Sequence, residues 1–158
     1  HVTTTPSVSY VVRTENFDCG IMISASHNPF YDNGIKIIGG NGQKMDAEVE
    51  AMIEGYIDDD VPKIPFATKE KIGRTVDFAA GRNRYIGYLI SIPTRSFKNY
   101  RVGLDCSNGS ASSVAKSVFD ALGAKTYVIN NEPDGTNINT NCGSTHTKTR
   151  FYNINMFV

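Results

Sequence analysis

The sequence predicts an α/β protein with mixed or parallel sheets flanked by helices, divided into two small domains. Three observations lead to this prediction: short apolar runs of strand length at residues 20–23 and 35–38, a helical apolar stripe at residues 45–57, and a strand–helix–strand pattern over residues 102–129. The length of 158 residues is enough for one ordinary domain or for two small ones.

The charge balance and the composition exclude several classes of protein. There are 16 basic and 16 acidic side chains, so the chain lacks the excess of basic residues that is typical of nucleic-acid-binding proteins. No run approaches the ~20 apolar residues that a membrane-spanning helix needs, and the first residues do not resemble a signal peptide. The odd number of cysteines, Cys19, Cys106 and Cys142, favours a reducing compartment. We therefore expect a cytoplasmic protein whose partners include neither nucleic acid nor membrane.

Two strands and two helices are expected in residues 1–62. Thr5 followed by Pro6 is typical of a helix N-cap with proline in the first turn. The run at residues 20–23 is apolar without polar alternation, which predicts a strand buried on both faces. A second strand is predicted at residues 35–38, because a glycine-rich turn follows it.

The second helix of this half is predicted over residues 45–57, and Asp46 is suited to cap its N-terminus. The acidic run at residues 58–60 is interpreted as the solvated end of that helix rather than as a metal site. Residues 63–80 are polar and aperiodic, which is typical of a linker between domains.

A second domain is predicted over residues 81–146. It begins with a helix at residues 83–92, and a strand at 102–106, a helix at 111–122 and a strand at 126–129 follow. A strand–helix–strand order within one sheet forms a right-handed crossover, so the two strands are expected to be parallel. The polar loops after these strands then lie where open α/β folds usually bind ligands.

One polar loop carries side chains suited to catalysis. Ser26 and His27 follow the first predicted strand, and Lys36 comes after a turn. Together they supply a nucleophilic hydroxyl and groups that donate protons or neutralise charge, which phosphoryl transfer needs. A Ser-His-Asp hydrolase fits less well, because neighbouring side chains diverge and no Gly-x-Ser-x-Gly elbow surrounds the serine. From the residues alone, an ordinary capped loop without a catalytic role also stays open.

Longer motifs resemble the α-D-phosphohexomutase family. Residues 24–36, SASHNPFYDNGIK, resemble its phosphoserine loop, and residues 4–8, TTPSV, resemble a helix start in its first domain. Residues 102–109, VGLDCSNG, resemble the opening strand of its second domain, and the motifs at residues 134–139 and 142–146 resemble the segment that follows.

The resemblance implies a four-domain architecture, of which this chain holds two incomplete domains. Residues 1–62 correspond to the C-terminal part of domain 1, residues 63–80 to a linker, and residues 81–146 to part of domain 2. Residues 147–158 form an atypical tail, because apolar residues alternate there in a strand pattern where the family has a helix.

The resemblance also implies a mechanism. Ser26 would carry a phosphoryl group as phosphoserine, and His27 and Lys36 would assist proton transfer and charge stabilisation. A Mg²⁺ ion would bridge the Ser26 phosphate and an aspartate-rich loop that this sequence does not contain. The implied substrate is a hexose phosphate, and glucosamine phosphate is expected because the loop is nearest to bacterial members that act on it.

Three interpretations of function stay open. The first is a mutase that interconverts glucosamine 6-phosphate and glucosamine 1-phosphate through a sugar bisphosphate, with this chain as a truncated portion that is inactive alone. The second is a non-catalytic remnant that folds or self-associates through its incomplete sheets, since unpaired strand edges attract other chains. The third is the same chemistry on mannose or glucose phosphates, because the loop that selects the sugar lies outside this sequence.

Overall fold

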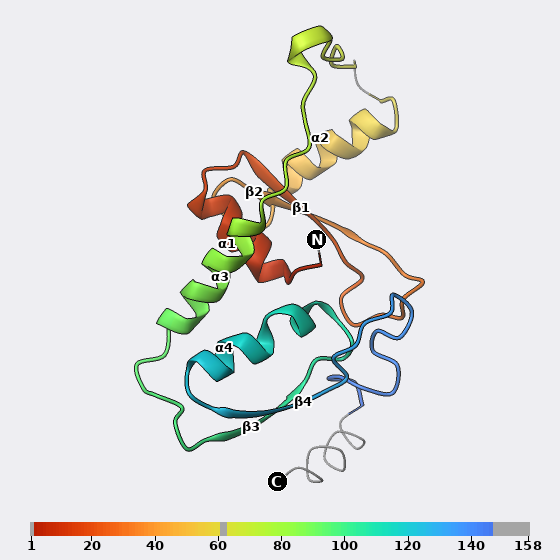
Figure 1. Cartoon of the computed structure of the whole chain (residues 1–158). Helices are drawn as coiled ribbons and strands as arrows, with labels where there is room; N and C mark the ends of the chain where they lie inside the picture. Colours follow the sequence, from red (N-terminus) through yellow and green to blue (C-terminus); the bar gives the residue numbers. More distant parts are fainter. Residues whose placement is uncertain (1, 61–62, 147–158) are drawn as a thin grey trace.

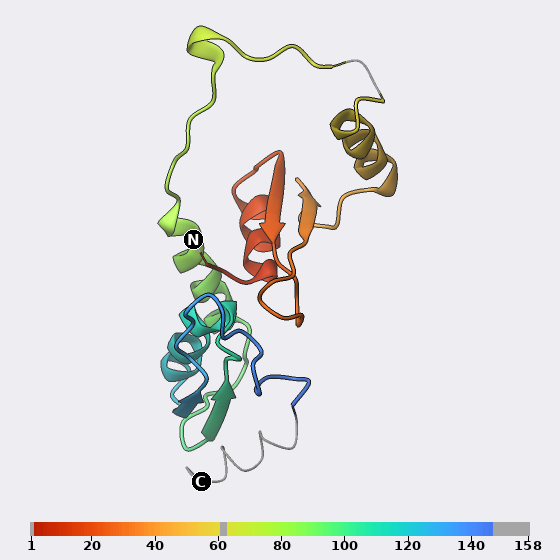
Figure 2. The same cartoon turned by 90° about the vertical axis from the view of Figure 1, so that its right-hand side faces the viewer.

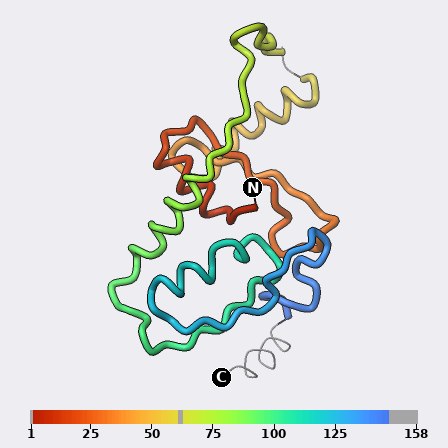
Figure 3. The backbone as a smooth tube through the Cα atoms, viewed as in Figure 1, coloured from red at the N-terminus to blue at the C-terminus, as the bar shows by residue number. Residues whose placement is uncertain are grey.

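The computed structural model describes residues 2–60 and 63–146, and Figures 1 and 3 show the course of the chain. None of the helices in these two ranges has the length and apolar character that crossing a bilayer demands. The strand pattern predicted in residues 147–158 lies outside the described residues.

Two small sheets organise the described residues. Strand β1 (Cys19–Ile23) pairs antiparallel with β2 (Ile35–Gly39), and β3 (Arg101–Asp105) pairs parallel with β4 (Lys125–Ile129). The helices that flank them are α1 (Thr5–Thr14), α2 (Ala47–Ile57), α3 (Ala79–Ser91) and α4 (Ala115–Ala121), with short 3₁₀ helices at Lys69–Lys71 and Ser110–Ser113. The predicted α/β class and the predicted parallel pair in the second half are therefore confirmed.

Helix α1 begins one residue earlier than the Thr5 cap predicts. Its N-cap is Thr4, whose carbonyl oxygen accepts hydrogen bonds from the backbone N–H groups of Ser7 and Val8. Pro6 still lies in the first helical turn, where a missing N–H costs nothing because such donors have no intrahelical partner.

Gly20 lets α1 pack closely on the first sheet. A Cβ atom added at Gly20 would lie 2.5 Å from Cγ2 of Val12 and 2.9 Å from Cγ1 of Val8. Val12 and Ile38, which is the pairing partner of Gly20, are both buried in this contact. The core of the first half is thus one helix against one face of a two-stranded sheet.

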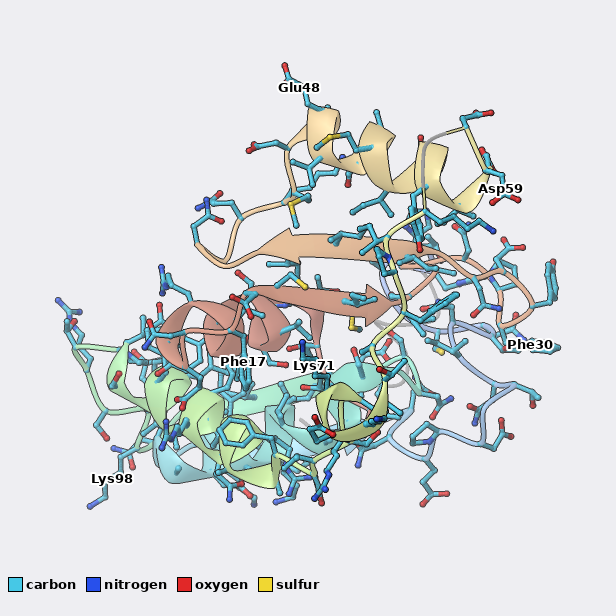
Figure 4. All side chains as sticks on the ribbon, turned by 90° about the horizontal axis from the view of Figure 1, so that it is seen from above. Phe17, Phe30, Glu48, Asp59, Lys71 and Lys98 are labelled. Carbon is cyan, nitrogen blue, oxygen red and sulfur yellow. The ribbon has the colours of Figure 1, made fainter. Side chains whose placement is uncertain are left out.

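The other face of this sheet is open, so the prediction that residues 20–23 are buried on both faces is wrong. Ile21, Ile23 and Ile35 are 63%, 67% and 72% exposed. In an antiparallel pair, residues directly opposite point to the same side, which puts Ile23 and Ile35 together on the face away from α1. Helix α2 begins near its predicted position, with Asp46 at the N-cap position but without a capping hydrogen bond from its side chain. The helix lies beyond β2, and none of its residues is buried (Figure 4).

Helix α3 joins the two halves. Tyr10 of α1 stacks on Tyr88 of α3 with ring centroids 4.6 Å apart, and it contacts the buried Tyr85 at 5.8 Å. Arg84 of α3 also forms an ion pair with Glu15 at the end of α1. Figure 2 shows α3 passing from the first sheet toward the second. The linker is therefore followed by α3, which packs on α1, and β3 comes next along the chain.

The helix predicted over residues 111–122 is divided in two. A 3₁₀ helix ends at Ser113, and α4 starts at Ala115 after Val114, whose φ of −131° is outside the helical range. Val114 and Val118 are nevertheless both buried. The apolar spacing was therefore correct about which residues face the core, but it cannot report a local break in the backbone.

We predict that Gly20→Ala lowers the free energy of unfolding by about 1–3 kcal/mol, because the new methyl group overlaps Val12 and Val8. Gly87→Ala is the matched control. Gly87 lies in α3 with nothing within 4 Å of an added Cβ, so alanine should stabilise the helix by about 0.5–1 kcal/mol. Urea denaturation of both variants measures the difference, and equal stability of the two variants would contradict the described packing.

Candidate active site

The Ser26 loop, residues 24–34, connects β1 to β2. Its base is fixed where the backbone N–H of Ser24 donates to the carbonyl oxygen of Gly34 at 2.8 Å. Inside the loop, a turn ends where the N–H of Asn28 donates to the carbonyl of Ala25 at 3.1 Å. Phe30, labelled in Figure 4, lies at the outer end of the loop. The hydrogen bonds give an exposed loop a defined local shape.

Ser26 has a backbone conformation that is unusual for a serine. Its φ is +59°, in the left-handed region, and its N–H donates to the Oγ of Ser24 at 3.1 Å. Such conformations cost free energy in a non-glycine residue and gather at functional sites. Ser26 is exposed, and among the described residues no hydrogen bond engages its hydroxyl group. The local backbone thus presents a free hydroxyl on a constrained turn.

The other two predicted site residues, His27 and Lys36, lie in different parts of the hairpin. His27 follows Ser26 in the same exposed turn. Lys36 is also exposed, but it lies on β2, where it pairs with Met22. No hydrogen bond in the described part of the chain joins the side chain of Ser26 to that of His27 or Lys36. Ser26 and His27 therefore share one turn, whereas Lys36 lies on the strand that follows the loop.

A cavity of about 630 Å³ separates the Ser26 loop from the second half of the chain. Ser26 is part of its wall, and His27 and Lys36 are not. Polar groups from both halves line it, namely Ser24, Ser26, Asn28, Asp32 and Asn33 from the loop and Asn108 and Ser110 from the second half. In Figure 1 the loop (orange) lies beside the segment after β4 (blue). Apolar side chains, among them Ile21, Ile23 and Ile138, form most of the remaining wall, so the serine hydroxyl lies at one side of a largely apolar cavity.

The carboxylate of Asp105 joins the loops that border the opposite wall. It accepts hydrogen bonds at 3.0 Å from the backbone N–H of Ser107, from Nδ2 of Asn130 and from the backbone N–H of Gly143. The buried Cys106 follows it, and burial, together with the Asp105 charge, raises the pKa of the Cys106 thiol. Three loops therefore meet at the end of β3.

Asn139 connects that wall to the Ser26 loop, and sequence reasoning did not single it out. Its Nδ2 donates to the carbonyl oxygen of Asn28 at 3.1 Å, although the two residues are 111 positions apart. Asp105 was also not among the predicted site residues. The available signal was weak: both residues lie in motifs that resemble the family, but no local pattern assigns either one a partner.

The described residues do not fit a magnesium site by themselves. Mg²⁺ prefers six oxygen ligands, and it is commonly held through one or two carboxylates. Among residues 2–60 and 63–146, no three His, Cys, Asp or Glu side chains are close enough to share a metal ion. Asp32 contributes a carboxylate to the cavity wall, but it has no cluster of further ligands beside it in the described residues.

Comparison with known proteins identifies relatives across nearly the whole chain. A family model described as phosphoglucomutase/phosphomannomutase, alpha/beta/alpha domain I, matches residues 1–63. The chain is 71% identical to a phosphoglucosamine mutase of Lachnoclostridium phytofermentans and 72% identical to one of Lachnospira eligens, in each case over 146 residues and 92% of this chain. These matches cover 33% and 32% of the two relatives, so the chain spans about a third of their length.

A solved structure supports the fold. A phosphoglucomutase/phosphomannomutase family protein of Burkholderia thailandensis aligns with a TM-score of 0.63 over 84% of this chain and 29% of that chain, at 20% identity. At that identity the likeness concerns the arrangement of the backbone only. In sequence, the chain is thus similar to phosphoglucomutase/phosphomannomutase domain I over residues 1–63 and to phosphoglucosamine mutases over 146 residues, and the solved structure agrees with the fold.

Proposed function

We propose that Ser26 is the phosphoryl carrier in the active site of a phosphoglucosamine mutase, to which this chain contributes the phosphoserine side. The observation that carries the proposal is the left-handed, exposed Ser26 with its free hydroxyl at the edge of a cavity between the two halves of the chain. A nucleophile on a constrained turn pays little entropy when it meets its reaction partner. The names of the relatives at 71% and 72% identity support glucosamine phosphate as the sugar.

The proposed reaction is two phosphoryl transfers in opposite directions. Phosphorylated Ser26 gives its phosphoryl group to the O1 hydroxyl of glucosamine 6-phosphate: the P–O1 bond forms, the P–Oγ bond breaks, and the proton of the sugar hydroxyl is transferred to Oγ of Ser26. The bisphosphate then reorients and returns its 6-phosphoryl group to Oγ: the P–Oγ bond forms, the P–O6 bond breaks, and the serine proton is transferred to O6, which leaves glucosamine 1-phosphate. No atom is gained or lost by the serine over the cycle.

His27 and Lys36 would have supporting roles. His27 shares the turn with Ser26, so its imidazole is within the same exposed region to exchange the hydroxyl proton. The Lys36 ammonium on β2 would neutralise part of the phosphate charge. Both side chains are exposed, so they are free to turn toward a phosphate.

Magnesium and location complete the proposal. The Mg²⁺ that the family resemblance implies would neutralise charge on the transferring group, and it needs ligands beyond those the described residues supply. We also propose the cytoplasm as the location, on the basis of the cysteine content.

Incubation of the purified chain with a hexose 1,6-bisphosphate and Mg²⁺ tests the carrier role. We expect peptide mass spectrometry to find phosphate on Ser26, and we expect Ser26→Ala to abolish it. Ser24→Ala is the comparison variant, because Ser24 lies two residues away and also lines the cavity, so phosphate that persists in this variant does not depend on the Ser24 hydroxyl. Phosphate on Ser24 in the parent chain, or no phosphate on any serine, would contradict the proposal.

A second candidate function is self-association without catalysis. The exposed isoleucines on the open face of the first sheet favour it, because contiguous apolar surface usually marks an interface. The short two-stranded sheets also leave strand edges unpaired among the described residues.

If the open sheet face drives association, Ile35→Lys should shift the chain toward monomer in sedimentation velocity. Ile64→Lys is the control, since Ile64 is 71% exposed, close to the 72% of Ile35, and lies in the linker away from the sheet. An unchanged distribution of species in Ile35→Lys, or an equal shift in both variants, would rule out this face as the interface.

A further inference from the structure

One side-chain hydrogen bond ties the Ser26 turn to the second half of the chain. Asn139 donates from Nδ2 to the carbonyl oxygen of Asn28 at 3.1 Å, and Asn28 closes the turn through its own N–H bond to Ala25. Ser26 lies inside that turn, between the two residues that the turn joins. We infer that Asn139 is a positioning residue, which holds the Ser26 hydroxyl at the cavity; as a role in phosphoryl transfer, this inference rests on the proposed function.

The backbone of Asn139 is held by hydrogen bonds within the second half of the chain. Its backbone N–H donates to the carbonyl oxygen of Ser107 at 2.9 Å, and Ser107 in turn donates to Asp105. Gly143 packs against the same place, because an added Cβ there would lie 2.5 Å from Oγ of Ser107 and 3.5 Å from Oδ1 of Asn139. The amide donor of Asn139 is therefore presented by a frame that starts at the end of β3.

The residue type at position 139 follows from backbone and side chain together. The φ of Asn139 is +60°, a conformation that Gly, Asn and Asp tolerate best. Of these three, only asparagine has a side-chain N–H that can bond to the carbonyl of Asn28. Aspartate at position 139 keeps the size and the backbone preference, but it places a carboxylate oxygen against the carbonyl oxygen of Asn28, and both atoms are acceptors. Glycine keeps the backbone conformation and removes the side chain.

The bond matters because, in residues 2–60 and 63–146, the other hydrogen bonds of the Ser26 loop stay within its own hairpin. The hydrogen bonds at Ser24, Ser26, Asn28 and Asp32 all have partners inside residues 24–34. Such bonds define the shape of the turn but not its position relative to the opposite wall. Asn139 supplies that position, so the serine and the cavity wall move as one unit.

Amide hydrogen exchange measured by NMR on the full chain tests this inference without any need for catalysis. In Asn139→Asp and in Asn139→Gly we expect exchange at the Ser26 and Asn28 amides to accelerate about fivefold, which is about 1 kcal/mol of local opening free energy. Asn141→Asp is the matched control, because Asn141 is exposed, has a φ of +54° and receives the same change in charge.

The pattern of exchange separates positioning from general damage. A positioning role confines the acceleration to the turn, whereas a merely structural role would also accelerate exchange at the β3 amides. Unchanged exchange at Ser26 and Asn28, or acceleration spread equally over β3, would overturn the inference. Transfer of phosphate to Ser26 is measured on the same samples and should be slower in the Asn139 variants. If the turn loosens while the parent chain accepts no phosphate, the positioning inference stands and the proposed function fails.

Discussion

Asp105 ends β3 with a carboxylate that accepts three hydrogen bonds, from Ser107, Asn130 and Gly143. Hydrogen bonds to a charged acceptor are stronger than those between neutral groups, and these three bring together segments that are 25 and 38 positions away from Asp105, as well as the residues next to it. The joined loops border the cavity, to which the neighbouring residues Asn108 and Ile138 contribute lining atoms. Without the Asp105 carboxylate, Asn139 has no fixed place from which to reach the Ser26 loop.

Within the described part of the chain, two contacts that lie apart from each other join the two halves. On one side, Tyr10 of α1 packs on Tyr85 and Tyr88 of α3. On the other, Asn139 bonds to Asn28 in the Ser26 loop. One contact is apolar and extended, and the other is a single directional bond. Together they explain how a serine from the first half and polar groups from the second half line one cavity.

Local sequence patterns predicted the helices and strands better than they predicted the burial and the long-range contacts of these elements. The parallel β3–β4 pair was predictable, because apolar runs on either side of a helical stripe leave few other topologies. The Ser26 loop was found through its residue types and motif. The exposure of Ile21 was not predictable, because an apolar run does not report whether a second layer covers it. The left-handed Ser26 and the Asn139 bond arise from turn geometry and from contacts across 111 positions, which no local pattern encodes.

The most direct test of the central role of Asp105 is the free energy of unfolding of Asp105→Asn, measured in urea. Asp134→Asn is the control: Asp134 also accepts three hydrogen bonds, but all come from Thr136 and Asn137 in one exposed turn, and those bonds hold its pKa below the ordinary value. We predict that Asp105→Asn lowers the free energy of unfolding by about 2 kcal/mol or more, because it removes charged acceptors for distant loops. A loss no larger than that in Asp134→Asn would contradict the account.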